Sequence, residues 1–232
     1  MYILHIETST SICSVALSRD GQLLACHDME DGMNHTALLA PAIEELLKSA
    51  SLVPGDLGAI AVSSGPGSYT GLRVGSSTAK AMAYSLGRPL ISVPTLMALA
   101  SAAFERHPEA RYAMPMIDAR RKEVYSILYD RSMSEVWPVS SVILSEEFFE
   151  TGIPMDGKVI CCGDGSLKIG ELSSKARNLT IDATIQCRAR HLIKPAMEAQ
   201  GEGKYQDPLH FVPYYHKPPN ITEPKKAGFT PQ

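Results

Sequence analysis

A strand, a glycine-rich loop and a helix follow one another between residues 59 and 86. Residues 59–62 are a short apolar run typical of a buried strand. Residues 71–86 have the spacing of an amphipathic helix, and Gly87 is placed to end it as a C-cap. The loop between them reads SSGPGSYT. The unit therefore predicts a layered α/β fold.

The flanking sequence extends this unit into a mixed sheet. Three β-prone runs open the chain, at 3–6, 12–17 and 22–26. The pair Asp20-Gly21 joins the last two and favours a hairpin turn, so an antiparallel meander is expected. Helices and strands then alternate, at 34–50, 59–62, 71–86, 89–93 and 96–104.

A polar stretch at 105–111 is the predicted boundary between two lobes, which gives domains at 1–107 and 108–216. The second lobe is expected to hold strands at 112–117 and 123–129, a strand and glycine turn at 158–165, and a helix at 186–199. Packing of that helix back onto the first lobe is one expectation. Both lobes place strands before helices, which suggests a duplicated architecture. Residues 217–232 are predicted to be a frayed tail.

Composition limits the classes of function. The formal net charge of −3 argues against a dedicated nucleic-acid binder, so any such role is indirect or uses a small local patch. The cluster Arg120-Arg121-Lys122 is more typical of a solvated turn than of such a patch. Five cysteines without a CxxC pair favour a reducing compartment, and the N-terminal residues resemble neither a signal peptide nor a membrane span. A cytoplasmic location without membrane attachment is expected.

Two turns are candidate phosphate loops. Glycine N–H groups between a strand and a helix can face an anion at the helix N-terminus. The glycine spacing fits neither a dinucleotide fingerprint nor a Walker A loop, and Ser and Thr are also ordinary turn formers. A purely structural turn is therefore the alternative. The candidate residues are Glu7, Thr8, Ser9 and Thr10 in the first turn and Gly65, Gly67, Ser68, Tyr69 and Thr70 in the second.

The helix at 71–86 carries a stripe of small residues at i, i+4 spacing: Gly71, Gly75, Ala79 and Ala83. Small side chains let another helix approach closely. That helix is either the one at 34–50 or a helix of another chain, and the spacing alone leaves both open.

Five segments together resemble the TsaB (YeaZ) family: ILHIETST, NHTALLAPAIEELL, GPGSYTGLRVG, MIDARRKEVY and VPYYHKPP. They occur in the family's order and span essentially the whole chain. The resemblance implies an actin-like (ASKHA, RNase H-like) two-lobe α/β fold with mixed sheets and a reduced second lobe. The family usually has Asp where this chain has Glu7, which agrees with a degenerate nucleotide site.

The resemblance also implies a function, as the non-catalytic partner of TsaD in tRNA N6-threonylcarbamoyladenosine synthesis. TsaD transfers threonylcarbamoyl to adenosine 37 of tRNA and holds its metal with a His-x-x-x-His pair. The matching positions here are Thr95 and Leu99, so no metal is expected, because leucine cannot ligate and a lone hydroxyl ligates poorly.

The partners follow from the same resemblance. A heterodimer with TsaD is implied, or a homodimer when TsaD is absent. TsaE and ATP or ADP join the complex, no cofactor is bound tightly by the chain alone, and tRNA is contacted only through the complex. The implied interface residues are Leu38, Leu39, Ala42, Gly71, Val74, Gly75, Thr78, Ala79, Met82 and Ala83.

The main alternative is an active actin-like kinase or ATPase. It requires two intact phosphate loops and a catalytic carboxylate, and Asp164 is the candidate carboxylate in the second lobe. A peptidase is a further alternative, but no Ser-His-Asp or Cys-His grouping is apparent from the spacing.

Overall fold

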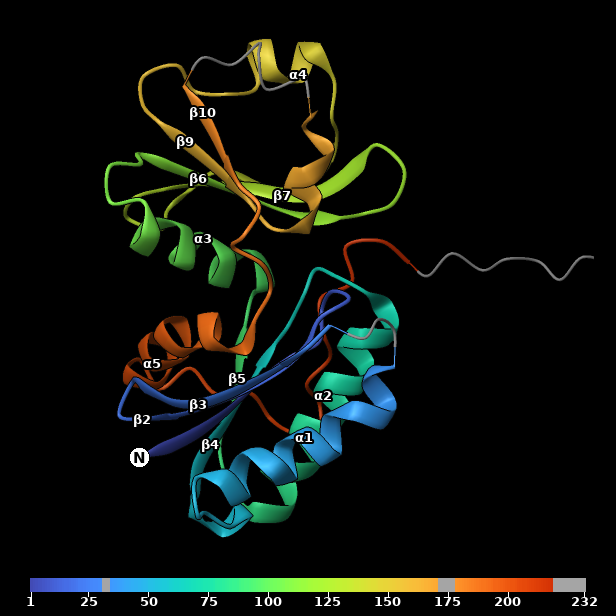
Figure 1. Ribbon diagram of the computed structural model, residues 1–232, viewed down its shortest axis with the longest axis vertical. Helices are drawn as coiled ribbons and strands as arrows, with labels where there is room; N and C mark the ends of the chain where they lie inside the picture. Colours follow the sequence, from blue (N-terminus) through green and yellow to red (C-terminus); the bar gives the residue numbers. More distant parts are fainter. Residues whose placement is uncertain (31–33, 171–177, 219–232) are drawn as a thin grey trace, which may run out of the picture.

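Two five-stranded mixed sheets form the centres of two lobes, which lie one above the other in Figure 1. The structure is a computed structural model that describes residues 1–30, 34–170 and 178–218. The first sheet has the order β3-β2-β1-β4-β5. Its strands are β1 (Tyr2–Glu7), β2 (Cys13–Arg19), β3 (Gln22–Met29), β4 (Leu57–Ser63) and β5 (Leu90–Val93).

The first sheet is covered on both faces, which is why its central strand is apolar at successive positions. Leu4 and Ile6 of β1 face α1 (His35–Ser49) and α2 (Tyr69–Leu86). Ile3 points to the other face, where α5 (Ile193–Gly201) packs. Alternate residues of a strand point to opposite faces, so a strand buried on both sides loses the alternating pattern. The predicted meander is confirmed, with Asp20 and Gly21 at the turn in left-handed conformations (φ 51° and 81°).

The second sheet repeats the connectivity of the first. Its order is β10-β9-β6-β7-β8, and its first strand likewise pairs antiparallel with the second and parallel with the fourth. The predicted duplication is therefore confirmed. α3 (Thr95–Arg106) covers one face and α4 (Glu146–Thr151) lies at the other. The strands are β6 (Tyr112–Asp118), β7 (Glu123–Asp130), β8 (Glu135–Ile143), β9 (Val159–Cys162) and β10 (Leu179–Asp182).

After the second sheet the chain returns to the first lobe. The turn η4 (Ala189–Leu192) and α5 pack on the first sheet, where Leu192 and Ala196 join its core. Arg188 anchors this return, because its guanidinium contacts Asp28 at 2.8 Å. The helix predicted at 186–199 thus begins later, as α5, and lies with the first lobe although the predicted second-lobe range ran to residue 216.

Residues 206–217, here called the C-terminal strap, run from the first lobe to the second. The strap begins beside β5, where the Gln206 N–H donates to the Leu90 carbonyl at 2.8 Å. Phe211 is buried in the core of the first lobe, and Lys80 of α2 donates to the Phe211 carbonyl at 2.7 Å. Lys217 reaches the second lobe and contacts Glu123 at 2.5 Å. Figure 1 shows the strap in red between α2 and the second lobe.

Within the described ranges, no helix combines the length and the apolar character needed to cross a membrane. Most of the predicted tail, residues 219–232, lies outside the described residues.

Candidate functional site

The two candidate phosphate loops lie against each other. The Ser68 N–H donates to the Ser9 carbonyl at 2.6 Å, and the Thr8 hydroxyl donates to the Gly71 carbonyl at 2.8 Å. A Cβ at Gly67 would lie 2.5 Å from the Ser9 carbonyl oxygen, so glycine is required there by the close approach of the β1–β2 turn. The structure therefore brings the two candidate loops together, a relationship that the sequence analysis did not predict.

Three N–H donors of the glycine loop, those of Gly65, Ser68 and Gly71, are used inside the chain. The Gly65 N–H donates to the Thr95 hydroxyl oxygen at 3.1 Å, and the Gly71 N–H donates to the Ser68 hydroxyl oxygen at 3.3 Å. The C-terminal strap covers the loop as well: Tyr214 N–H donates to the Ser64 carbonyl at 2.7 Å. A phosphate-binding loop needs several free N–H groups that converge on one anion. In this conformation the N–H groups of Gly65, Ser68 and Gly71 are not free to bind a nucleotide phosphate.

Glu7 is directed into the protein interior. Its side chain is buried, and its Oε1 accepts hydrogen bonds from the Ser9 N–H at 2.7 Å and the Ser63 hydroxyl at 2.8 Å. Burial raises the pKa of the Glu7 carboxyl, and the hydrogen bonds from Ser9 and Ser63 oppose this effect. The carboxyl group thus stabilises the β1–β4 junction and is not presented to a bound cation.

The two positions that match the metal ligands of the transferase are also internal. Thr95 is fully buried, with its hydroxyl engaged by Gly65, and Leu99 is fully buried among apolar side chains of the second lobe. Among the residues that the structure describes, no group of three or more His, Cys, Asp or Glu side chains is placed to hold a metal ion.

Asp164, the carboxylate required by the kinase alternative, follows β9 in the position that the glycine loop has after β4. Its Oδ1 accepts the Asp118 N–H at 3.1 Å, and burial raises the pKa of its carboxyl. Asp118 in turn binds the Lys168 ammonium at 2.6 Å. The carboxylate pair therefore holds the end of β6 against the turn after β9.

The small-residue stripe is packed inside the first lobe, so the structure favours an internal contact for this part of the predicted interface. A Cβ at Gly71 would overlap the carbonyl oxygen of Thr8. A Cβ at Gly75 would overlap the hydroxyl oxygen of the same threonine. Ala79 and Ala83 are buried in the core of the first lobe. The small side chains let α2 approach the β1–β2 turn and its own sheet. Two predicted interface residues of α1 are buried in the same core, namely Leu39 and Ala42.

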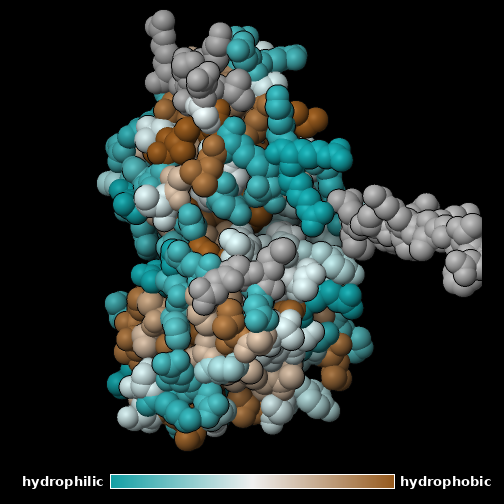
Figure 2. Space-filling view, turned by 45° about the vertical axis from the view of Figure 1, so that its right-hand side comes forward, coloured by the Kyte–Doolittle hydropathy of each residue, from teal (hydrophilic) through white to brown (hydrophobic). Residues whose placement is uncertain are grey.

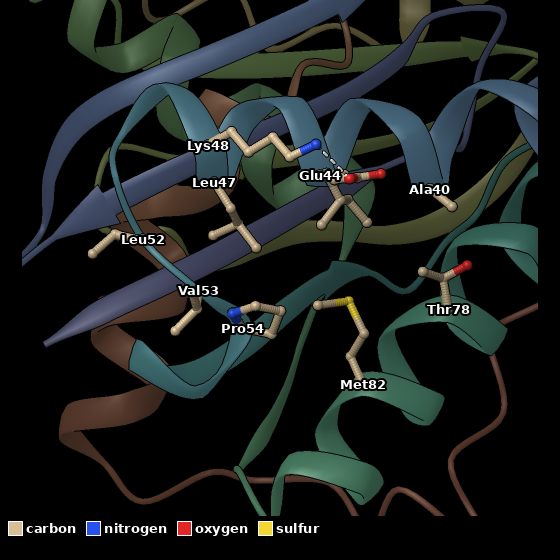
Figure 3. Close-up of a pocket in the computed structure, with 10 residues that line it drawn as sticks. Ala40, Glu44, Leu47, Lys48, Leu52, Val53, Pro54, Thr78 and Met82 are labelled. Carbon is tan, nitrogen blue, oxygen red and sulfur yellow. Dashed lines mark hydrogen bonds and ion pairs between the residues drawn. The ribbon is translucent and has the colours of Figure 1, made fainter.

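Four of the predicted interface residues, Leu38, Val74, Thr78 and Met82, are only half-buried. Thr78 and Met82 line an apolar groove of about 490 Å³ between α1 and α2. Figure 3 shows Leu47 and Met82 pointing into this groove from the two helices, with Val53 at its end. Val53 is 62% exposed, and the Glu44–Lys48 ion pair (2.6 Å) lies along the rim. An apolar groove with a charged rim is typical of a docking surface.

The isolated chain is expected to bind ATP only weakly, with a Kd at or above roughly 1 mM, or about −4 kcal/mol. The reason is that the loop donors are engaged by Ser9 and Thr95 and the strap covers Gly65. Isothermal titration calorimetry with Mg-ATP measures this affinity. Micromolar binding would favour the ATPase alternative.

The doubled five-stranded sheet, with one turn and one glycine loop at the strand ends of each lobe, defines a protein of the actin-like class. Residues 30–150 match the family described as "TsaD: tRNA N6-adenosine threonylcarbamoyltransferase". The chain is 31% identical over 219 residues to the tRNA threonylcarbamoyladenosine biosynthesis protein TsaB of Escherichia coli K12, covering 93% of this chain and 94% of that protein. The chain belongs to the TsaB (YeaZ) family.

Two further comparisons agree with this assignment. The TsaB protein of Bacillus subtilis 168 is 38% identical over 149 residues, which cover 63% of this chain and 64% of the relative. The solved structure of YeaZ from Pseudomonas aeruginosa superposes with a TM-score of 0.77 at 26% identity, covering 92% of this chain and 99% of that chain. The printed names of both TsaB relatives assign those proteins to tRNA threonylcarbamoyladenosine biosynthesis.

The sequence analysis missed two features of the site. It did not place Tyr214 against Gly65, and it did not include Val53 and Pro54 in the groove. The late segment VPYYHKPP was a signal for the first, since a run of aromatic residues beside prolines rarely stays in solvent without a contact. The exposed apolar pair Val53-Pro54 just after a helix was the signal for the second.

Proposed function

We propose that the chain is a non-catalytic partner subunit that docks through α1 and α2 onto a transferase of the TsaD type. The observation that carries this proposal is the burial of Thr95 and Leu99, which fills the position of a metal pair with a hydrogen-bonded hydroxyl and a core side chain. A catalytic metal needs ligands that converge on an accessible position. The chain supplies instead an apolar docking groove.

The proposed assembly is a heterodimer in which Leu38, Val74, Thr78 and Met82 contact the transferase. When the transferase is absent, the same surface forms a homodimer. A TsaE-type protein and ATP join the heterodimer, and the nucleotide is held by the complex. The assembly is proposed to act in the cytoplasm, where the five cysteines would stay as free thiols.

The purified chain alone is expected to form no threonylcarbamoyl-modified tRNA, because it has no metal-ligand pair at Thr95 and Leu99. Adding the transferase, the TsaE-type protein and the activated threonylcarbamoyl donor is expected to restore product. Mass spectrometry of nucleosides from digested tRNA measures the modification. Turnover by the chain alone, in preparations free of transferase, would disprove the partner role.

A further inference from the structure

Five aromatic rings gather where the C-terminal strap passes from the first lobe to the second. They are called here the aromatic band: Tyr69, Tyr125, Tyr214, Tyr215 and His216. Tyr69 and Tyr215 have ring centroids 4.7 Å apart, and Tyr125 and His216 have centroids 5.4 Å apart. The ring centroids of Tyr214 and His216 are 5.9 Å apart, and Tyr214 is 48% exposed. The band thus links α2, the strap and β7.

Four exposed cations border the aromatic band. Arg73 lies over the Tyr69 ring, with its guanidinium carbon 5.4 Å from the ring centroid. Arg120, Arg121 and Lys122 form the β6–β7 turn, directly before the strand that carries Tyr125. Among the residues the structure describes, none of these four side chains forms an ion pair with a carboxylate. In Figure 2 the second-lobe surface beside the base of the grey tail is strongly hydrophilic.

The neighbouring carboxylates do not neutralise these cations. Asp118 is paired with Lys168 at 2.6 Å, and Glu123 is paired with Lys217 at 2.5 Å. The turn itself is strained: Arg120 and Arg121 have φ angles of 72° and 52°. Residues other than glycine, asparagine and aspartate rarely adopt this left-handed backbone conformation. Backbone strain of this kind clusters at functional sites.

We propose that the aromatic band and its bordering cations bind a single-stranded segment of RNA. A base would stack on the exposed Tyr214 ring while the four cations contact phosphates, which is the combination that single-strand binders use. An acidic peptide would need the cations alone and would leave the exposed Tyr214 ring unused. This inference rests on the proposed function, since a tRNA substrate brings unpaired nucleotides to the complex.

The stacking half of the proposal is tested with the full chain and a fluorescein-labelled, unstructured RNA about 12 nucleotides long, read by fluorescence anisotropy at about 50 mM salt. Tyr214→Ala is expected to weaken binding at least about fivefold, the loss of one stacked base. Tyr214 anchors the strap through its backbone N–H, so the alanine variant keeps that contact. Tyr214→Phe is expected to bind like the unmodified chain.

Tyr84→Ala is the matched control, because Tyr84 of α2 is, like Tyr214, an exposed tyrosine (65% exposed). It lies 15 residues from Tyr69, or about 22 Å along the helix. The control is expected to bind RNA like the unmodified chain. An equal loss in Tyr84→Ala, or no saturable binding at all, would overturn the proposal.

The charged half is tested with Arg120→Glu against Lys194→Glu, an exposed lysine on α5 at the opposite face of the first sheet. Only Arg120→Glu is expected to weaken binding, by about tenfold, and contacts to about four phosphates predict a log–log salt slope of about −3. Competition by oligoglutamate together with an unchanged Tyr214→Ala affinity would show an acidic protein partner and overturn the RNA proposal. Failure here leaves assembly with the transferase unaffected, so the two proposals fail separately.

Discussion

Replacing Gly71 by alanine is expected to lower the free energy of unfolding by about 3 kcal/mol, the upper end for overpacking a close contact. The added methyl group would overlap the carbonyl oxygen of Thr8. That oxygen is part of the backbone of the β1–β2 turn, which cannot rotate away as a side chain would. Thr8 is also fully buried and its hydroxyl bonds the Gly71 carbonyl, so the turn and the helix would both shift. Urea unfolding followed by circular dichroism measures the loss.

The control for this change is Gly201→Ala, at the last residue of α5, where an added Cβ meets no atom within 4 Å. Its stability is expected to stay within about 0.5 kcal/mol of the unmodified chain. If Gly71→Ala changed association with a partner and left the unfolding curve unchanged, the stripe would be an intermolecular contact after all.

Replacing Met82 by arginine is expected to weaken the complex with the transferase by at least about tenfold, because an unpaired charge would be buried in an apolar contact. Met82 points into the groove between α1 and α2 (Figure 3), and the free chain can turn an arginine there toward solvent. Stability of the isolated chain is therefore expected to change little. Biolayer interferometry with immobilised transferase measures the affinity.

Met197→Arg is the matched control, since Met197 is a half-buried methionine of α5 on the opposite face of the first sheet. It is expected to leave the affinity for the transferase unchanged. Equal binding by Met82→Arg and the unmodified chain would exclude the α1–α2 groove as the docking surface.

Local patterns in the sequence were sufficient for most of the first lobe. Asp20-Gly21 fixed a hairpin because both residues tolerate positive φ, and Gly87 ends α2 in the left-handed conformation expected of a C-cap (φ 60°). The second lobe was harder. β8 is an edge strand, so it is only partly buried and tolerates Pro138. Its residues are of mixed polarity, and its sequence therefore did not indicate a strand.

The site depended on contacts between residues distant in sequence, which periodicity cannot reveal. Small residues at i, i+4 spacing favour a close approach, but only the position of the Thr8 carbonyl shows that the approach is to the β1–β2 turn. The same limit applies to Tyr214, which meets the glycine loop after about 150 intervening residues. The motifs were therefore found and their spatial relationship was not.

Size-exclusion chromatography with light scattering, on the chain mixed with the TsaD-type transferase of the same organism, tests the central proposal most directly. The partner role predicts that the two proteins elute together, with the mass of one copy of each. The chain alone is expected to elute as a homodimer, which the transferase replaces by binding the same α1–α2 surface. Separate elution of the two proteins at micromolar concentrations, each folded by circular dichroism, would contradict the partner role.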